Sequence, residues 1–203
     1  MMRADRQPRQ RLAPEERREG ILAASSEAFR DQPYDRVSLV SVAVAAGASE
    51  ALVHKYFEGK AGLYAELVRR AVRELDRRQQ QALAELADGV PARDRVRACA
   101  LAYLDHVREH PGGVSAVHRA PAGEPETAAA LREAARSDGV ARLRSFLAPG
   151  QGERHNFALH GYFGFLEAAC ERWAGEGCPE NQRWPLVEAA LGALEGALGD
   201  WGR

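Results

Sequence analysis

The stretch that decides the fold runs from Val37 to Leu63 and reads V-S-L-V-S-V-A-V-A-A-G-A-S-E-A-L-V-H-K-Y-F-E-G-K-A-G-L. Ser38 and Ser49 each stand where a hydroxyl can cap a helix by accepting a backbone N–H. Gly47 lies between them, and glycine readily takes the left-handed conformation in which helices often end. The pattern predicts two short helices joined by a tight turn, a helix-turn-helix whose second helix enters the DNA major groove.

Over about residues 15–64 the chain also resembles a known family, the tetracycline-repressor-type (TetR family) transcriptional regulators. The resemblance lies in the order and spacing of these residues: Phe29, Tyr34, Ser38, Ala43, Ala46, Gly47, Ser49, Tyr56, Phe57, Lys60 and Leu63. It implies an all-α fold of about nine helices. A helix-turn-helix DNA-binding domain at 14–60 would follow an Arg-rich arm at 1–13, which we expect to be disordered. A larger ligand-binding and dimerisation domain would occupy 61–203.

The resemblance implies a set of DNA-contacting residues, in part on phosphates and in part on base edges. The set is Ser38, Ser49, Glu50, Ala51, Leu52, His54, Lys55, Tyr56 and Lys60. The family usually has Tyr at His54, a basic or small residue at Glu50 and Gly at Ala51. Glu50 therefore has two interpretations: an acceptor for cytosine N4, or an acidic residue that the helix dipole favours at this end.

Charge is distributed unevenly along the 203 residues, although the formal net charge is only −1. Residues 1–80 carry 15 Lys and Arg against 12 Asp and Glu, whereas residues 81–203 carry 13 against 17. A basic N-terminal part on an acidic remainder fits a protein that meets phosphate at one end.

The composition also predicts the surroundings of the protein. No run is long enough to span a membrane and the first residues show no signal peptide, so we expect a cytoplasmic protein without membrane partners. The three cysteines have no metal-binding spacing, which indicates reduced thiols and predicts neither a metal nor a cofactor.

Apolar periodicity predicts further helices after the helix-turn-helix. Their expected ranges are 61–87, 93–110, 126–147, 153–174 and 179–201, with a short helix at 114–119. The first of these would connect the DNA-binding domain to the rest of the chain. The triplet Ser137-Asp138-Gly139 is a candidate kink in the third.

A polar and aromatic stripe beside the apolar stripe of residues 93–110 is typical of a pocket wall. The expected pocket residues, including possible opposite walls, are Cys99, Tyr103, His106, His110, Phe146, Phe157 and His160. Such a lining indicates a hydrophobic or aromatic ligand. His106 and His110 also have an i, i+4 spacing that a metal could use, but ordinary partly buried histidines are the simpler interpretation.

The resemblance implies that the last two helices pack against their copies in a homodimer, as a four-helix bundle. The residues expected at this interface are Leu159, Phe163, Leu166, Trp173, Val187, Leu191, Leu194 and Leu198. The alternative is that these side chains form only an intrachain core.

The sequence bears on three classes of function. The leading hypothesis is a ligand-responsive regulator, a repressor, which binds a palindromic operator as a homodimer and is released by a small molecule. The alternative is a DNA-binding protein of the same fold without an effector, controlled by a protein partner or acting structurally on DNA. An enzyme is disfavoured, since the sequence has no nucleophile elbow, P-loop, dinucleotide fingerprint or zinc motif.

Overall fold

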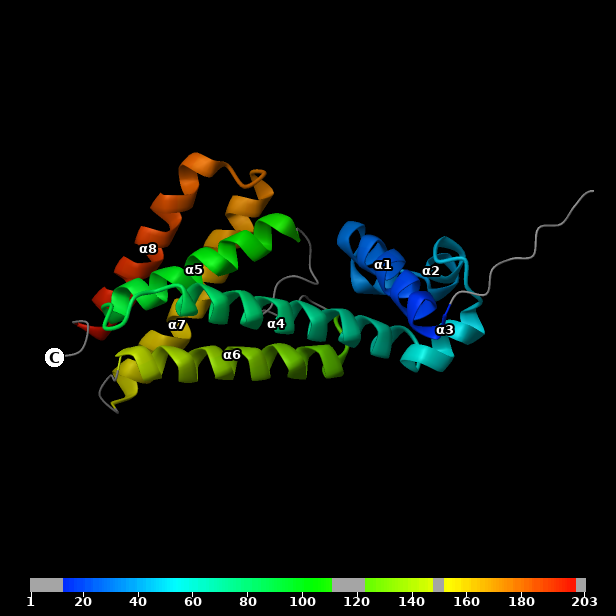
Figure 1. The fold of residues 1–203 in the computed structure, drawn as a ribbon, viewed down its shortest axis with the longest axis horizontal. Coiled ribbons are helices and arrows are strands. Elements are labelled where there is room, and N and C mark those ends of the chain that lie inside the picture. Colours follow the sequence, from blue (N-terminus) through cyan, green and yellow to red (C-terminus); the bar gives the residue numbers. More distant parts are fainter. Residues whose placement is uncertain (1–12, 111–122, 148–151, 200–203) are drawn as a thin grey trace, which may run out of the picture.

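The computed structural model describes residues 13–110, 123–147 and 152–199, and the regular structure within these ranges is entirely helical. The molecule is elongated, with the N-terminal helices at one end and the C-terminal helices at the other (Figure 1). The elements are α1 (Pro14–Asp31), the 3₁₀ helix η1 (Tyr34–Arg36), α2 (Leu39–Ala45), α3 (Glu50–Phe57), α4 (Lys60–Ala84), α5 (Ala92–Glu109), α6 (Glu126–Leu147), α7 (Glu153–Gly175) and α8 (Glu180–Leu198).

The expected all-α fold is confirmed, with eight α-helices in the described ranges against about nine expected. The short helix expected at 114–119 and the Arg-rich arm at 1–12 lie outside these ranges. Helix α4 ends at Ala84 and not at residue 87. Within the described parts of the chain, no helix combines the length and apolarity needed to cross a membrane.

Helices α1, α2, α3 and the first half of α4 form the N-terminal head, which is built around one hydrophobic core. Its fully or almost fully buried members are Ile21, Leu22, Val42, Val53, Leu63 and Val68. The turn between α2 and α3 has Gly47 at a φ of +62°, as the sequence predicted. Ala128 from α6 is also buried in this core, so the head is closed by a helix that lies far away in sequence.

The end of α3 and the start of α4 approach so closely that Gly62 is required. A Cβ at this position would lie 1.9 Å from the backbone carbonyl oxygen of Phe57. We expect Gly62→Ala to lower the free energy of unfolding by about 1–3 kcal/mol, because the backbone of α3 or α4 must move. Chemical unfolding measures this. Gly20→Ala is the control, since its Cβ meets nothing within 4 Å and alanine favours a helix. Equal destabilisation by both variants would contradict the argument.

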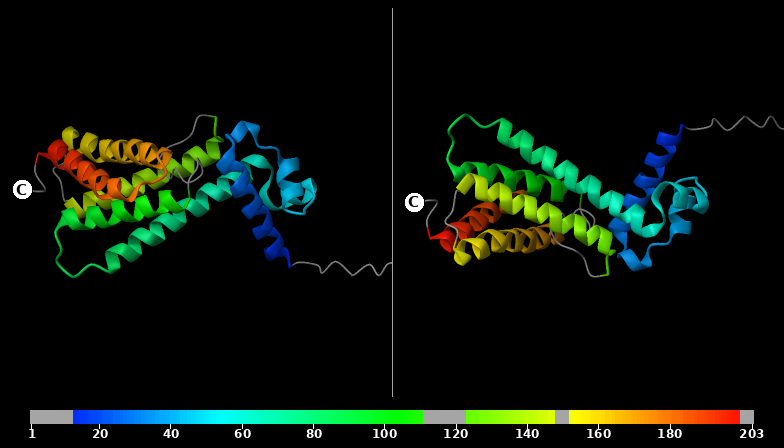
Figure 2. Two further views of the ribbon diagram at one scale, coloured as in Figure 1. Left: turned by 90° about the horizontal axis from the view of Figure 1, so that it is seen from above. Right: turned by 90° about the horizontal axis from the view of Figure 1, so that it is seen from below.

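The second core lies among the C-terminal half of α4 and helices α5 to α8. Helices α4 and α6 lie side by side along the molecule, from this core toward the head (Figures 1 and 2). Helix α6 runs through the triplet Ser137-Asp138-Gly139, the candidate kink, as one continuous helix. Glycine is needed there for packing, because a Cβ would lie 2.6 Å from the ring of Phe163.

The residues expected at a dimer interface lie inside this second core, so that prediction is corrected. None is more than 7% exposed in the single chain. The eight residues are Leu159, Phe163, Leu166, Trp173, Val187, Leu191, Leu194 and Leu198. Helices α7 and α8 pack against each other and against α5, and this packing already uses their most apolar stripes. A second copy would have to contact their other faces.

Candidate DNA-binding surface and ligand cavity

Helix α3 presents one face to the core of the head and the other to solvent. The hydroxyl of Ser49 accepts from the backbone N–H of Leu52 at 3.3 Å and caps the helix. Val53 and Phe57 are buried. The exposed residues are Glu50, Ala51, His54 and Lys55, with Leu52 and Tyr56 half-buried beside them. All six belong to the expected DNA-contact set, and the structure gathers them on and beside the outer face of α3.

Lys60 and Ser38 lie differently from the simplest expectation. Lys60 donates to the backbone oxygen of Asp35 at 3.4 Å, and its Nζ lies 4.3 Å from the ring centroid of Tyr34. Both contacts hold the start of α4 against η1. Ser38 stands at the N-cap of α2 and is exposed, but its hydroxyl accepts no capping bond. Its backbone oxygen accepts from the Ser41 hydroxyl at 2.7 Å.

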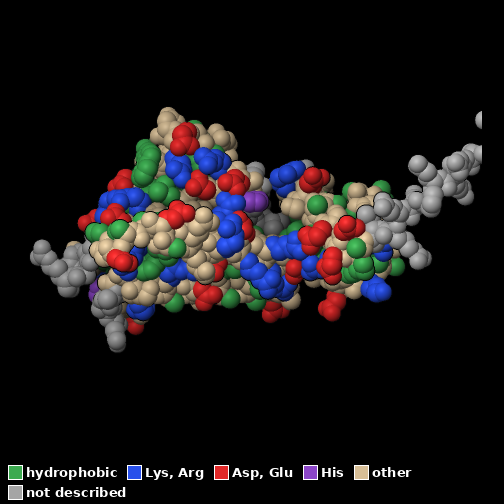
Figure 3. Space-filling model, viewed as in Figure 1, with side chains coloured by type: hydrophobic (Ala, Val, Ile, Leu, Met, Phe, Trp, Pro, Cys, Tyr) green, Lys and Arg blue, Asp and Glu red, His purple; other side chains and the backbone are tan. Residues whose placement is uncertain are grey.

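Glu50 and His54 face each other across one turn of α3, with Oε1 and Nε2 3.9 Å apart. The pair is attractive only when the imidazole is protonated. Over the view in Figure 3, Lys and Arg side chains are interspersed with Asp and Glu. The face seen in Figure 3 is therefore not uniformly basic. Binding of phosphate by the head would depend on particular Lys and Arg side chains.

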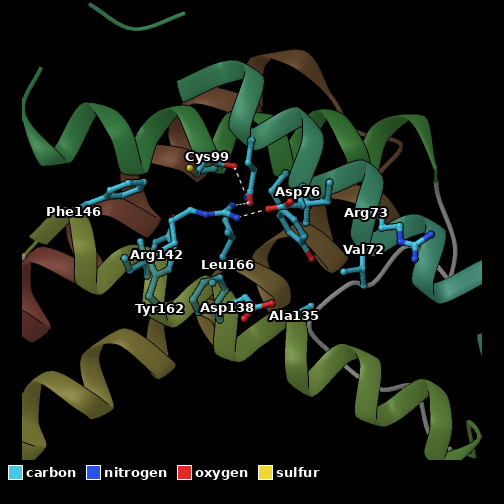
Figure 4. Close-up of a pocket in the computed structure, with 17 residues that line it drawn as sticks. Val72, Arg73, Asp76, Cys99, Ala135, Asp138, Arg142, Phe146, Tyr162 and Leu166 are labelled. Carbon is cyan, nitrogen blue, oxygen red and sulfur yellow. Dashed lines mark hydrogen bonds and ion pairs between the residues drawn. The ribbon is translucent and has the colours of Figure 1, made fainter. Parts of the chain in front are cut away.

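A cavity of about 260 Å³ lies between α4, α5, α6 and α7 (Figure 4). Most of its lining is apolar or aromatic: Val72, Leu75, Ala100, Tyr103, Ala135, Leu143, Phe146, Tyr162, Phe163 and Leu166. Burial raises the pKa of both tyrosines, Tyr103 and Tyr162, so these hydroxyls stay protonated.

A polar cluster forms one part of the cavity wall. The guanidinium of Arg142, on α6, donates to Asp76 and to the amide oxygen of Gln79, both on α4 (Figure 4). Gln79 in turn donates to the backbone oxygen of Cys99 at 3.2 Å, which connects α4 to α5. Burial raises the pKa of the Cys99 thiol to about 11, so the thiol is neutral near pH 7.

Three of the seven expected pocket residues line this cavity: Cys99, Tyr103 and Phe146. The prediction is wrong for the other four. His106 is 1% exposed but is not in the cavity wall. His110, Phe157 and His160 are exposed. The four residues of the stripe predicted on α5 lie on one face of the helix, but the cavity reaches only as far as Tyr103 along this helix, and His106 and His110 lie about one and two turns beyond it.

Several lining residues were not predicted from the sequence, namely Asp76, Gln79, Arg142, Tyr162 and Phe163. The first three are charged or amide side chains that a helical pattern places on a solvated face. Phe163 was assigned to the dimer interface. In the described part of the chain, no cluster of three or more His, Cys, Asp or Glu could hold a metal ion.

Comparison with known proteins supports the similarity noted from the sequence. Residues 21–67 match the family described as bacterial regulatory proteins, tetR family. A curated relative, the HTH-type transcriptional activator FasR of Mycolicibacterium smegmatis, is 31% identical over 125 residues. That alignment covers 61% of this chain and 56% of FasR, so the matched part spans little more than half of the relative.

Two solved structures extend the similarity beyond the head. A tetR-family transcriptional regulator from Streptomyces coelicolor has a TM-score of 0.67 and 25% identity, covering 92% of this chain and 80% of the other. The regulator FadR from Bacillus subtilis, in complex with stearoyl-CoA, has a TM-score of 0.65 and 14% identity, covering 89% and 97%. The second likeness is one of fold alone.

Proposed function

We propose that the chain is a TetR-family transcriptional regulator and not an enzyme, and that it acts as a ligand-responsive repressor that binds a palindromic operator as a homodimer. The observation that carries the proposal is the position of the cavity. It lies between α4 and α6, and both helices continue into the core of the DNA-binding head. A ligand that binds better to one arrangement of these helices lowers the affinity for DNA when DNA binds better to the other arrangement.

In this proposal the outer face of α3 reads the operator. Ser38, Ser49, Tyr56, Lys60 and His54 position the head on phosphates. Glu50, Ala51, Leu52 and Lys55 meet base edges. The support is the exposure of Glu50, Ala51, His54 and Lys55 on one face of a capped helix.

The proposed homodimer uses the outer faces of α7 and α8. Small residues are exposed on α8 at Ala189, Gly192, Ala193 and Gly196, which allows another helix to approach closely. Trp184 is also half-exposed on this helix. Two heads joined in this way can meet half-sites about one duplex turn or more apart.

The alternative is a regulator without a small-molecule effector, controlled by a protein partner or acting structurally on DNA. A filled C-terminal core would favour that alternative. The cavity of about 260 Å³, lined by aromatic rings, favours an effector. The relative FasR is named an activator, so a promoter fused to a reporter gene decides between repression and activation.

Selection of sites from a random duplex library tests DNA binding directly. We expect a palindrome, because a symmetric dimer presents two identical heads. Affinity for the selected site should fall steeply with salt, with a slope of about −0.9 per phosphate contact on a log–log plot. A single half-site would argue against the dimer, and a flat salt response would argue against phosphate-positioned binding. The same selection repeated with Glu50→Ala should lose its preference at one base pair if Glu50 reads bases, and should return the same site if Glu50 is only an acidic residue at the helix N-terminus.

A further inference from the structure

We propose that the cavity binds a small monocarboxylic acid, whose carboxylate pairs with Arg142 and whose apolar body lies against the aromatic rings. This inference rests on the proposed function only in calling the bound molecule the effector. It starts from the polar cluster, where Arg142 of α6 is paired with Asp76 of α4. The cavity lining is mostly apolar, and its other charged or amide side chains are Arg73, Gln79 and Asp138, of which Asp138 is exposed to solvent.

The two partners of this ion pair are buried to different extents. The side chain of Arg142 is 23% exposed, whereas that of Asp76 is 45% exposed. Asp76 also accepts from the amide of Gln80 at 2.7 Å. Loss of the pair would therefore leave Asp76 with a second hydrogen bond and access to water, while Arg142 would remain a cation in a largely apolar wall.

This asymmetry selects the charge of the ligand. A cationic ligand would take Asp76 and leave the guanidinium of Arg142 with only the neutral amide oxygen of Gln79 in place of its carboxylate partner, which is costly inside the protein. A carboxylate would take Arg142 and release Asp76 toward solvent. The guanidinium is also the better host, since its planar donors match the two oxygens of a carboxylate. An anionic ligand is thus favoured over a cationic one.

The remaining lining limits the body of the ligand. The cavity of about 260 Å³ is just below the range of about 300–1,000 Å³ typical of drug-sized ligands. Tyr103, Phe146 and Tyr162 supply aromatic surface. A single aromatic ring or a short alkyl chain next to the carboxylate suits this space.

The pair that such a ligand would replace connects α4 to α6. Gln79, which accepts from the same guanidinium, lies one turn of α4 beyond Asp76. A carboxylate that competes with Asp76 would weaken a direct contact between the two helices that lead to the head. Binding of the carboxylate would thereby change the packing of α4 against α6, and with it the arrangement of the head that is proposed to bind DNA.

Calorimetric titration of the purified chain with matched probes tests the ligand class. The probes are octanoate and 3-phenylpropanoate, their neutral amides, and octylamine. We expect the acids to bind about 10- to 100-fold more tightly than the amides, because hydrogen bonds to a charged group contribute a difference of this size. Octylamine should bind most weakly. Equal binding of acids and amides, tighter binding of octylamine, or no binding of either acid would overturn the proposal.

Three variants locate the carboxylate. Arg142→Met should abolish the preference for acid over amide, and Asp76→Asn should strengthen acid binding by removing the competing carboxylate. Arg144→Gln is the control, because Arg144 lies on the same helix but donates to Asn156 outside the cavity wall. If Asp76→Asn bound the acids more weakly than the unmodified chain, the proposal that the ligand carboxylate competes with Asp76 for Arg142 would be wrong. This outcome can be measured even if Arg142→Met does not fold.

The ligand class and the proposed function can fail separately. Calorimetry without DNA measures only the ligand class, and site selection without ligand measures only DNA binding. If the acids bind but no DNA site is selected, the proposed function as a DNA-binding regulator is wrong. If a site is selected but acids and amides bind equally, the proposed carboxylate ligand is wrong.

Discussion

Replacement of Glu124 with alanine is expected to lower the free energy of unfolding by about 3–5 kcal/mol, because it removes one partner of a buried ion pair. The side chains of Arg132 and Glu124 are 1% and 2% exposed, with Nε and Oε2 3.0 Å apart. Arg132 also donates to the hydroxyl of Tyr64 at 3.4 Å. Without the carboxylate, the charge of the guanidinium is no longer compensated by Glu124 in a region that water hardly reaches.

The position of this pair makes the effect more than local. Tyr64 lies at the start of α4, and its ring centroid is 4.9 Å from that of Phe29 and 5.2 Å from that of Tyr34. Arg132 is on α6. The buried pair therefore joins the beginning of α6 to the aromatic part of the head core, and Glu124→Ala should loosen both.

Thermal unfolding measures this prediction. A loss of this size should lower Tm by on the order of 10 °C for a domain of this length. Glu133→Ala is the control, since Glu133 is exposed on α6 next to Arg132 and its removal should change stability by less than about 0.5 kcal/mol. The double change Glu124→Leu with Arg132→Met should recover most of the stability, because it removes both charges. Equal Tm values for Glu124→Ala and Glu133→Ala would contradict the prediction.

The helix-turn-helix could be predicted from sequence because its signals are local. A cap at Ser49, a left-handed glycine at Gly47 and apolar spacing within α3 act over a few residues. The structure has each of them where the sequence placed it. The exposed face of α3 follows from the same spacing, since burial of Val53 and Phe57 turns the intervening residues outward.

The cavity could be predicted only in part, because it depends on how four helices meet. Periodicity identifies the face to which Cys99 and Tyr103 belong, but does not identify the helix opposite. Arg142 and Asp76 carry charges that a helical pattern assigns to solvent. Their pairing across α4 and α6 depends on the approach of residues 66 positions apart, and no local signal reports it.

The residues expected at the dimer interface show again that sequence periodicity does not identify the packing partner of a helix. Periodicity correctly identified one apolar stripe on α7 and another on α8. It could not determine whether these stripes meet a second chain or each other, because the free energy of burial is the same in both cases. In the structure Leu159 and Leu191 are fully buried within one chain.

Stability is expected to fall as the pH drops from about 6.5 to about 4, because His106 must remain neutral in the folded protein. Its side chain is 1% exposed, and within the described residues neither ring nitrogen has a hydrogen-bond partner. Burial, followed by the charges of His110 and Arg78, lowers its pKa from 6.5 to about 4, against smaller opposing contributions from Glu74 and Glu109. The imidazole of His110 lies 5.0 Å away, ring centroid to ring centroid.

The direction follows from proton binding. Between pH 6.5 and 4 the unfolded chain binds a proton at His106 that the folded chain does not, so acid favours unfolding. The stabilisation is complete above pH 6.5 and is lost progressively down to pH 4, in total about 3 kcal/mol. Urea unfolding between pH 7.5 and 5 measures this dependence before the glutamates in ion pairs, such as Glu74 with a pKa of about 2, take up protons.

Two variants separate His106 from the other titrating groups. His106→Leu removes the imidazole but keeps an apolar side chain of similar size, so the slope of stability against pH should fall by up to about 1.4 kcal/mol per pH unit. His160→Gln removes an exposed imidazole of α7 and should leave the slope nearly unchanged. If His106→Leu kept the slope of the unmodified chain, the acid sensitivity would have to come from other groups, and the interpretation of His106 as a buried neutral imidazole would be wrong.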